Sequence, residues 1–302
     1  MPELPDLELY LHAMRPRLTG QRLLRIRLAS PFLVRSVDPP IQAADSKVVT
    51  GLRRLGKRVV LAMEDDLFLV IHLMIAGRFR WKESGAKVPG KLGLAAFDFP
   101  NGTLLLTEAG SQRRASLYLV QGEQSLAALD PGGIEVLGST AAEFASVLTR
   151  ENHTLKRALT DPHFFSGIGN AYSDEILHAA RLSPMQLTSR LTPEQLTGLH
   201  AQVVSVLTKW RDALIAETGD AFPEKVTAFR EEMAAHGKFG KPCPACGTPI
   251  QRIKYAANEA NYCPACQTGG KLLADRGLSR LLKGDWPKTL EELEQYKNSR
   301  RT

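Results

Sequence analysis

The four cysteines of this 302-residue chain constrain its fold more than any other feature. They form two identical CPAC segments separated by 16 residues, a C-x2-C-x16-C-x2-C pattern. This spacing allows four thiolates to surround one Zn²⁺ tetrahedrally, and the metal would supply folding energy that so short a segment lacks. Two disulfides or free thiols are the alternatives, and a reducing compartment disfavours disulfides. We therefore predict one structural zinc ion, with Cys243, Cys246, Cys263 and Cys266 as its ligands.

The charge of the chain indicates a polyanionic partner. The formal net charge is +7 and the sequence pI is about 9.3, a mildly basic balance typical of proteins with such a partner. The sequence has no apolar run of about 18 residues, so a membrane span is not expected. Its N-terminus contains acidic residues and no apolar segment typical of a signal peptide. We expect an intracellular, cytoplasmic protein associated with the nucleoid.

The first part of the chain alternates short apolar runs with polar turns. Apolar residues at helical spacing predict a helix over residues 7–14, and Pro16 predicts that this helix is short or ends irregularly. Residues 64–66 are expected to form a hairpin loop. Several short strands at this spacing indicate an antiparallel sandwich or barrel. The expected strands cover residues 22–28, 58–63, 67–73, 92–99, 103–107 and 116–120.

The second part of the chain has a helical pattern. The turn cluster DPGG at 130–133 marks a domain boundary. A Gly/Lys-rich linker at 237–242 leads into the cysteine module, and a capping box from Thr289 to Glu292 predicts a short terminal helix. The fold class is therefore α+β. The expected helices of this part cover residues 141–149, 154–160, 171–180, 193–215 and 223–234.

The segment SGIGNAYSDEIL at residues 166–177 combines a glycine-rich turn with a helix start. Gly167 and Gly169 permit tight backbone turns, and Asn170 then lies at or near the first helical position. The free N–H groups and positive dipole end of a helix start suit a DNA phosphate. Without further context, such a glycine-rich turn more often has no phosphate-binding role.

Four segments together resemble the Fpg/Nei family of DNA glycosylases (formamidopyrimidine-DNA glycosylase and endonuclease VIII). They are MPELPDLE at the start, residues 155–184, HGKFGKPCPACG at 236–247 and YCPACQ at 262–267. They occur in the family's order and at its distances, over about residues 1–267. The resemblance implies a β-sandwich catalytic domain with a flanking helix at 1–130 and a helix–two-turn–helix domain at 131–236. A zinc finger at 237–270 and a charged tail at 271–302 would follow, and damaged DNA would bind between the two domains.

The resemblance also implies a bifunctional activity, base excision followed by abasic-site cleavage. Removal of Met1 would expose Pro2 as the nucleophile. An α-amino group has an ordinary pKa near 8, so a useful fraction is neutral near pH 7 and can attack C1′ to form a Schiff base. Glu3 would act as an acid toward the ribose ring oxygen. Lys57 would contact the lesion or the phosphate beside it.

Further residues take their expected roles from the same resemblance. We expect DNA contacts from Lys156, Asn170, Arg113, Arg252, Lys254 and the position of Asn258. Lesion-pocket or supporting positions are Asp6, Met74, Ile75, Ala115 and Glu175. Asp6 stands where the family commonly has Glu.

Two departures from the family pattern bear on lesion preference. Asn258 stands where the zinc finger usually carries an arginine that grips phosphate, so one charge-assisted contact is missing. Ile75 and Ala115 stand where methionine and phenylalanine usually fill the gap left by the flipped base. These losses predict weak activity on 8-oxoguanine in duplex DNA. They favour single-stranded DNA, abasic sites, oxidised pyrimidines or bulkier lesions.

Two other interpretations compete with a monomeric repair enzyme. A lesion-sensing DNA-binding protein of the same fold would explain the loss of arginine at position 258, but not Pro2, Glu3 and Lys57. A zinc-ribbon factor that binds RNA or protein would explain the cysteines and leave the N-terminus unexplained. The resemblance favours the enzyme.

Overall fold

The computed structural model describes residues 1–110, 112–255, 258–274 and 287–299. The chain forms two compact units. The first combines Met1–Gly133 with Thr208–Ala228, and the second combines Ile134–Leu207 with Phe229–Thr302. The finer division into a zinc finger and a terminal tail stays a prediction. No helix among the described residues is long and apolar enough to cross a bilayer.

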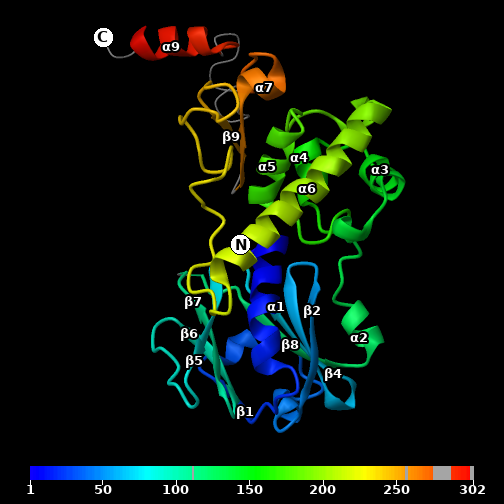
Figure 1. Ribbon diagram of the computed structural model, residues 1–302, viewed down its shortest axis with the longest axis vertical. Helices are drawn as coiled ribbons and strands as arrows, with labels where there is room; N and C mark the ends of the chain where they lie inside the picture. The colour runs from blue at the N-terminus through cyan, green and yellow to red at the C-terminus, as the bar shows by residue number, and fades with distance from the viewer. Residues whose placement is uncertain (111, 256–257, 275–286, 300–302) are drawn as a thin grey trace. The chain divides into compact units, whose positions relative to one another are not determined.

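Two four-stranded antiparallel sheets form the first unit (Figure 1). One sheet has the order β1-β6-β7-β5, and the other has the order β2-β3-β4-β8. The strands of the first sheet are β1 (Arg25–Leu28), β6 (Gly93–Phe99), β7 (Gly102–Glu108) and β5 (Gly77–Lys82). Those of the second are β2 (Val49–Leu55), β3 (Arg58–Met63), β4 (Leu67–His72) and β8 (Ser116–Gln121). The three-residue 3-10 turn Glu64–Asp66 joins β3 to β4, as predicted for a hairpin loop.

One hydrophobic core joins both sheets to the helix α1 (Leu4–Leu18). Leu61 of the second sheet and Phe97 of the first belong to the same buried cluster as Tyr10 of α1, so the sheets form a sandwich. The other face of β3 and β4 is also buried, beneath Leu126 of the short helix α2 (Glu123–Ala127). Burial on both faces explains why these two strands have continuous apolar sequences instead of alternating ones.

The predicted strands of the first unit are mostly confirmed, with three differences. Only residues 25–28 of the expected 22–28 form β1, and Arg22 makes an isolated bridge to Val48. β2 and β5 were not predicted, because arginine and lysine side chains on their more exposed faces interrupt the apolar pattern.

The prediction of a short or irregular helix at Pro16 was wrong. α1 runs through Pro16 to Leu18, and this proline occupies the last turn. The buried face of α1, which includes Leu7, Leu11 and Leu18, gains enough from packing to outweigh the hydrogen bond that the proline ring removes.

The second unit is mainly helical (Figure 1). Four of the five expected helices are present, each within three residues of its predicted end. They are α3 (Ala141–Thr149), α4 (Leu155–Thr160), α5 (Asn170–Ala179) and α6 (Pro193–Thr218). A capping box between Thr140 and Glu143 begins α3. Residues 208–218 of α6 are grouped with the first unit.

The predicted helix at 223–234 was wrong, because this segment has no regular secondary structure. Val226 is buried in the hydrophobic core of the first unit. The backbone N–H groups of Ala234, Ala235 and His236 donate to the Glu175 carboxylate instead of to helical carbonyls. Specific tertiary contacts thus override the modest helix propensity of the segment.

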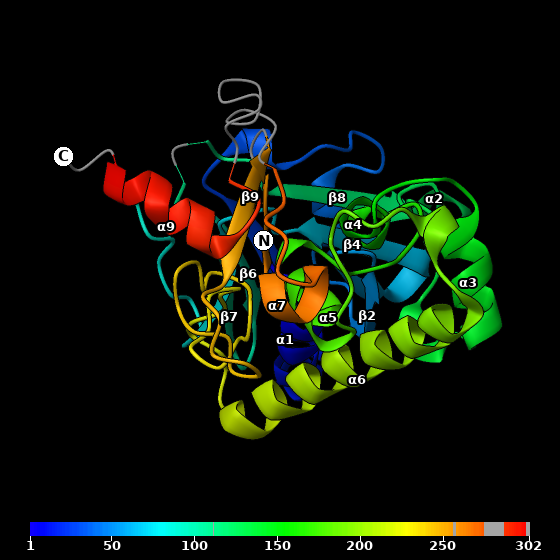
Figure 2. The ribbon, with the colours of Figure 1, turned by 90° about the horizontal axis from the view of Figure 1, so that it is seen from above.

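The cysteine-rich part of the second unit contains an antiparallel hairpin and a short helix. β9 (Gln251–Tyr255) pairs with β10 (Asn258–Tyr262), and α7 (Pro264–Thr268) follows. Figure 2 shows α7 beside α5. A terminal helix, α9 (Leu290–Ser299), confirms the prediction made from the Thr289–Glu292 capping pattern.

Candidate active site and nucleic-acid interface

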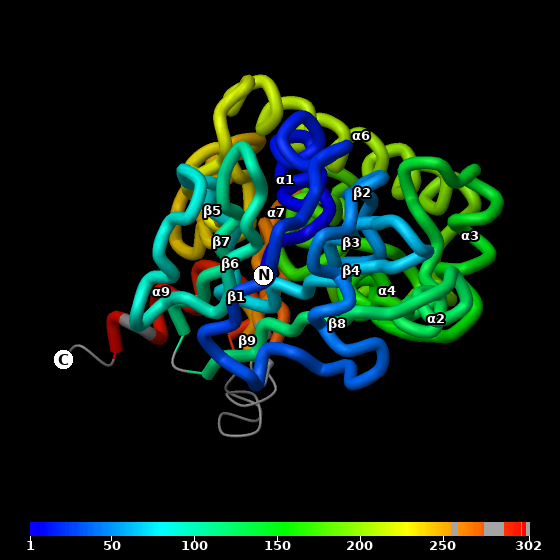
Figure 3. Tube along the Cα trace, turned by 90° about the horizontal axis from the view of Figure 1, so that it is seen from below, coloured from blue at the N-terminus to red at the C-terminus, as the bar shows by residue number. Residues whose placement is uncertain are grey.

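One end of the second sheet gathers several of the predicted site residues. Lys57 lies in the turn between β2 and β3, and β4 ends at His72. In the strand register, His72 lies between Arg58 of β3 and Ser116, the first residue of β8. The turn with Lys57, the end of β4 and the start of β8 therefore occupy the same end of the sheet (Figure 3).

The N-terminus has an unusual electrostatic environment. Burial lowers the pKa of the terminal amino group on Met1, while the carboxylates of Glu3 and Asp6 act in the opposite direction. The cations of Arg78 and Lys57 lower this pKa further. The terminal amine thus lies within electrostatic range of both Glu3 and Lys57, which the sequence analysis paired with it.

The first turn of α1 fixes the backbone beside Pro2. Pro2 is buried, Glu3 is 2% exposed and Asp6 is fully buried. Glu3 and Asp6 form a capping box, in which the Glu3 backbone N–H donates to Asp6 Oδ2 at 3.0 Å. The shorter acid that replaces the family's usual Glu therefore has a structural role as a helix cap. Glu3 is thus a buried carboxylate two residues from the terminus.

The loop between β4 and β5 presents one large apolar side chain to solvent. Met74 has a φ of 51°, in the left-handed region that bulky residues rarely adopt. A Cβ on Gly77 would lie 2.2 Å from the Leu73 carbonyl oxygen, so the turn requires glycine there. Ile75 at the tip is 62% exposed. The structure thus exposes the residue that replaces the family's methionine.

A buried carboxylate shapes the segment before β8. The side chain of Glu108 accepts the backbone N–H groups of Arg114 and Ala115, each at 3.1 Å. Arg113 is exposed, and its guanidinium donates to the Lys91 carbonyl at 2.6 Å. Ala115 is only 4% exposed. This position therefore offers a duplex almost no surface, in agreement with the predicted loss of the aromatic.

His72 and Arg78 are not among the site residues predicted from the sequence. Burial lowers the pKa of His72 from its usual 6.5 to about 4, and Arg58 and Lys57 add to the shift. Arg78 lies on β5 and donates to the carbonyls of Gly77 and Ile75. His72 ends β4 and Arg78 lies on β5, on either side of the loop that carries Met74 and Ile75. The proximity of Arg78 to the terminus and of His72 to Lys57 depends on tertiary structure that the local sequence does not reveal.

In the second unit, a buried ion pair occupies the site where phosphate contacts were expected. Lys156 is 2% exposed, and its Nζ donates to Asp174 Oδ1 at 2.5 Å and to the Asn170 carbonyl at 2.6 Å. The other oxygen of Asp174 accepts from His236 Nδ1 at 2.8 Å and from Asn261 Nδ2 at 3.0 Å. Lys156 thus belongs to an internal hydrogen-bond network, and it binds the carbonyl of Asn170, the first residue of α5.

The helix start at Asn170 agrees with the prediction. Gly167 has a φ of 82°, a conformation that favours glycine, and Gly169 is the cap residue before α5. Glu175, one turn further along, anchors residues 234–236 through their three backbone N–H groups. Glu175 therefore holds the chain that leads into the cysteine module.

The four cysteine sulfurs form a cluster suited to a metal ion. They all lie within 4.8 Å of one another, with 4.0 Å between Cys243 and Cys266 and 3.4 Å between Cys246 and Cys263. Tetrahedral zinc with Zn–S bonds of about 2.3 Å places its sulfurs about 3.8 Å apart. The cluster thus fits one structural Zn²⁺. The ring Nε2 of His178 lies 3.1 Å from the Cys243 sulfur, so α5 also contacts a predicted ligand.

The hairpin beside the cysteines carries the remaining predicted DNA contacts. The Arg252 guanidinium packs over the Phe239 ring at 4.4 Å and lies 3.8 Å from Glu259. Lys254 is exposed and pairs in register with Glu259. Asn258 begins β10, and its side chain lies outside the described residues.

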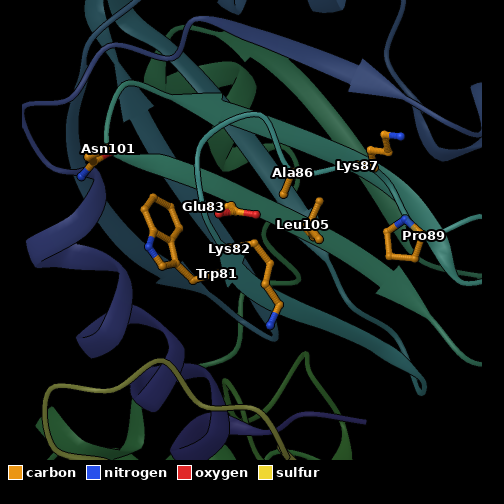
Figure 4. A pocket seen from close by; sticks show the side chains of 8 residues that line it. All are labelled: Trp81, Lys82, Glu83, Ala86, Lys87, Pro89, Asn101 and Leu105. Atoms are coloured by element: carbon orange, nitrogen blue, oxygen red, sulfur yellow. The ribbon is translucent and has the colours of Figure 1, made fainter.

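A hollow of about 640 Å³ lies on the first unit (Figure 4). Trp81, Lys82 and Lys87 contribute to its lining, as does Asn101. None of the residues that line it was predicted to have a role in catalysis or DNA binding.

Three family models match the chain in sequence order. The formamidopyrimidine-DNA glycosylase N-terminal domain matches residues 1–113, and the H2TH domain of the same glycosylase matches residues 134–216. The zinc finger found in FPG and IleRS matches residues 240–269.

Relatives and solved structures agree with these models. The formamidopyrimidine-DNA glycosylase of Desulforamulus reducens is 30% identical over 279 residues, which cover 88% of this chain and 99% of the relative. An uncharacterized formamidopyrimidine-DNA glycosylase-like protein of Mycobacterium tuberculosis is 40% identical over 156 residues, 52% of this chain and 95% of that protein. A complex of Lactococcus lactis Fpg with DNA containing an oxidized pyrimidine has a TM-score of 0.78 at 26% identity, and covers 88% of this chain and all of that one.

The chain belongs to the formamidopyrimidine-DNA glycosylase family. This confirms the resemblance found in the sequence and the α+β fold class.

The Asp174 network predicts a large cost for a small substitution. Asp174→Asn keeps the side-chain shape but removes the counter-ion of the buried Lys156 ammonium. We expect the free energy of unfolding of the second unit to fall by about 3–5 kcal/mol, measured by urea denaturation.

Glu151→Gln is the matched control, because Glu151 is an exposed acid of the same unit that pairs with Arg150 and His153. Its substitution should cost at most about 1 kcal/mol. An equally small loss for Asp174→Asn would contradict the importance of the network.

His72 predicts a pH dependence of stability. Its pKa is about 4 in the folded protein and about 6.5 when unfolded, so between these values the unfolded chain binds the proton. The contribution of the neutral His72 ring to the free energy of unfolding is therefore complete above pH 6.5. This contribution, up to about 3 kcal/mol, is lost as the pH falls toward 4. Urea unfolding from pH 7 to pH 4.5 should show this loss in the wild type but not in His72→Gln. The exposed His12→Gln is the control, and equal slopes for all three proteins would refute the assignment.

Proposed function

We propose that this protein excises damaged bases from DNA and then cleaves the strand at the resulting abasic site. Family membership supports the class of reaction, because relatives named formamidopyrimidine-DNA glycosylase match nearly the whole chain. The observation that carries the proposal is the terminal amine itself. Burial and two nearby cations lower its pKa, and the buried carboxylate of Glu3 lies two residues along the chain.

The proposed chemistry begins with removal of Met1. The Pro2 nitrogen, one residue further along, would share the burial and the positive charges that lower the pKa of the terminal amine. A larger neutral fraction at pH 7 would then attack C1′ of the damaged nucleotide. The C1′–N bond breaks and the base leaves with a proton, while Glu3 protonates the ring oxygen so that the sugar opens and an iminium forms. Loss of a C2′ proton and of the 3′ phosphate cleaves the strand.

We propose separate roles for the basic residues. Lys57 contacts the phosphate beside the lesion, because its turn lies at the same end of the sheet as His72. Arg113, Lys254 and Arg252 contact phosphates further away. The helix start at Asn170 binds a phosphate with its backbone N–H groups. Lys156 acts indirectly, by holding the Asn170 carbonyl.

The proposed setting follows from the substrate. We infer that a monomer binds damaged DNA in the cytoplasm, on the nucleoid. The structural relatives include Lactococcus lactis Fpg bound to DNA that contains an abasic site. The positive net charge of +7 supports a polyanionic partner.

Borohydride trapping on abasic DNA tests the nucleophile. The wild type should form a covalent adduct that mass spectrometry maps to Pro2. A form with extra residues left before Pro2 should bind the same DNA without forming the adduct. Glu3→Gln should lower base excision by about 10²–10⁴-fold, while the exposed Glu123→Gln should leave excision unchanged.

Two outcomes would contradict the proposal. Tight binding of the wild type to abasic DNA without any adduct would favour the lesion-sensing alternative. An adduct that maps to a lysine instead of Pro2 would refute the assigned nucleophile.

We further propose a preference for single-stranded or already disrupted DNA. The absent arginine at 258 and the nearly buried Ala115 both weaken the hold on a duplex from which a base has flipped. Asn258→Arg should raise affinity for a duplex with an abasic-site analogue by about tenfold. It should also steepen the dependence of log K on log salt by about 0.9.

Asn258→Gln is the control, since it lengthens the side chain without adding charge. Lesion cleavage should be compared on single-stranded and duplex oligonucleotides of the same sequence. Efficient removal of 8-oxoguanine from duplex DNA by the wild type would contradict this proposed preference.

A further inference from the structure

The segment after β1 exposes an aromatic side chain. Phe32, in the 3-10 turn Pro31–Leu33, is 80% exposed, although the next residue, Leu33, is buried in the core of the first unit. Among the exposed large hydrophobic side chains described for this unit, Phe32 is the one aromatic. A lone exposed side chain is common on protein surfaces, so the position of Phe32 in the sheet decides what its ring can contact.

The segment is held in register against β8. Val34 forms a parallel bridge with Leu117, and the Arg35 N–H donates to the Leu117 carbonyl at 2.8 Å. Further along, the Leu119 N–H donates to Ser36 Oγ at 2.8 Å. Because the two segments run parallel, residues before Val34 lie toward the start of β8. Phe32 therefore sits near the first residues of that strand.

This position places Phe32 at the end of the sheet that carries the candidate site. The start of β8 pairs with the end of β4, where His72 lies, and His72 pairs with Arg58 beside Lys57. Ala115 immediately precedes β8. Phe32 and Ala115 each precede the paired Val34 and Leu117 by two residues, so both lie toward the start of β8.

We propose that Phe32 stacks on an unstacked base of the bound DNA. This inference rests on the proposed function and identifies a residue that recognises the disrupted duplex. Every base presents a π-face, so an exposed phenyl ring recognises an unstacked base of any sequence. Arg35, three residues along and also exposed, supplies a cation for the adjoining phosphate. The bridge and the buried Leu33 hold the ring ready before DNA binds.

Affinities for two duplexes of the same sequence test the inference, one intact and one with a tetrahydrofuran abasic analogue. Phe32→Ala should weaken binding to the abasic duplex by about 5- to 100-fold. Its affinity for the intact duplex, in which every base is stacked, should change by less than about twofold. Phe32→Trp should restore tight binding, because its ring also stacks.

Val37→Ala is the matched control. Val37 is 90% exposed on the same segment but lies beyond the bridge, further along β8. Its substitution should leave both affinities unchanged. Thermal unfolding of each variant verifies that the first unit remains folded.

The outcomes separate this inference from the proposed function. Equal losses on both duplexes, or no loss on either, would overturn the role of Phe32. If the wild type forms no borohydride adduct but Phe32→Ala loses only abasic-duplex binding, the proposed catalysis fails and the stacking role stands. If the adduct forms and Phe32→Ala binds like the wild type, the stacking role fails alone.

Discussion

The buried carboxylate of Asp174 is the interaction on which the second unit depends. It accepts hydrogen bonds from Lys156 of α4, from His236 ahead of the cysteines and from Asn261 of β10. A buried carboxylate without partners would be costly, so each of these segments must be in place for the others to be stable. The network therefore couples the helical part of the unit to the hairpin of the cysteine module.

The metal site reinforces the same coupling. Cys243 and Cys263 are buried, and the ring of His178 on α5 contacts the Cys243 sulfur. Glu175, next to Asp174 in sequence, fixes the three backbone N–H groups that precede the module. Asp174, Glu175 and His178, within little more than one turn of α5, thus contact the start of α4, the entering chain and a predicted metal ligand. These contacts support the start of α5, which is the helix start proposed to bind phosphate.

The sequence predicted the features that depend on local spacing. Cysteine spacing identified the metal cluster, and periodicity located α3 to α6. Prediction from the sequence failed where long-range contacts determine the structure. β5 has charged residues on its exposed face and was missed, and Val226 and Glu175 hold residues 223–236 out of a helix. Two of the partners of Asp174, His236 and Asn261, lie 62 and 87 residues away, so no motif around Asp174 could show that its second oxygen is also hydrogen-bonded.

The capping box at the start of α1 has a consequence for reactivity. A chain terminus usually samples many conformations, and a terminal nucleophile would lose that freedom each time it reacts. Here Glu3 and Asp6 bond reciprocally, and the first helical turn is buried. The conformational entropy of these N-terminal residues is therefore lost when the chain folds, before any substrate binds. The proposed Pro2 nucleophile would then meet a bound sugar at a high effective molarity, although it belongs to the end of the chain.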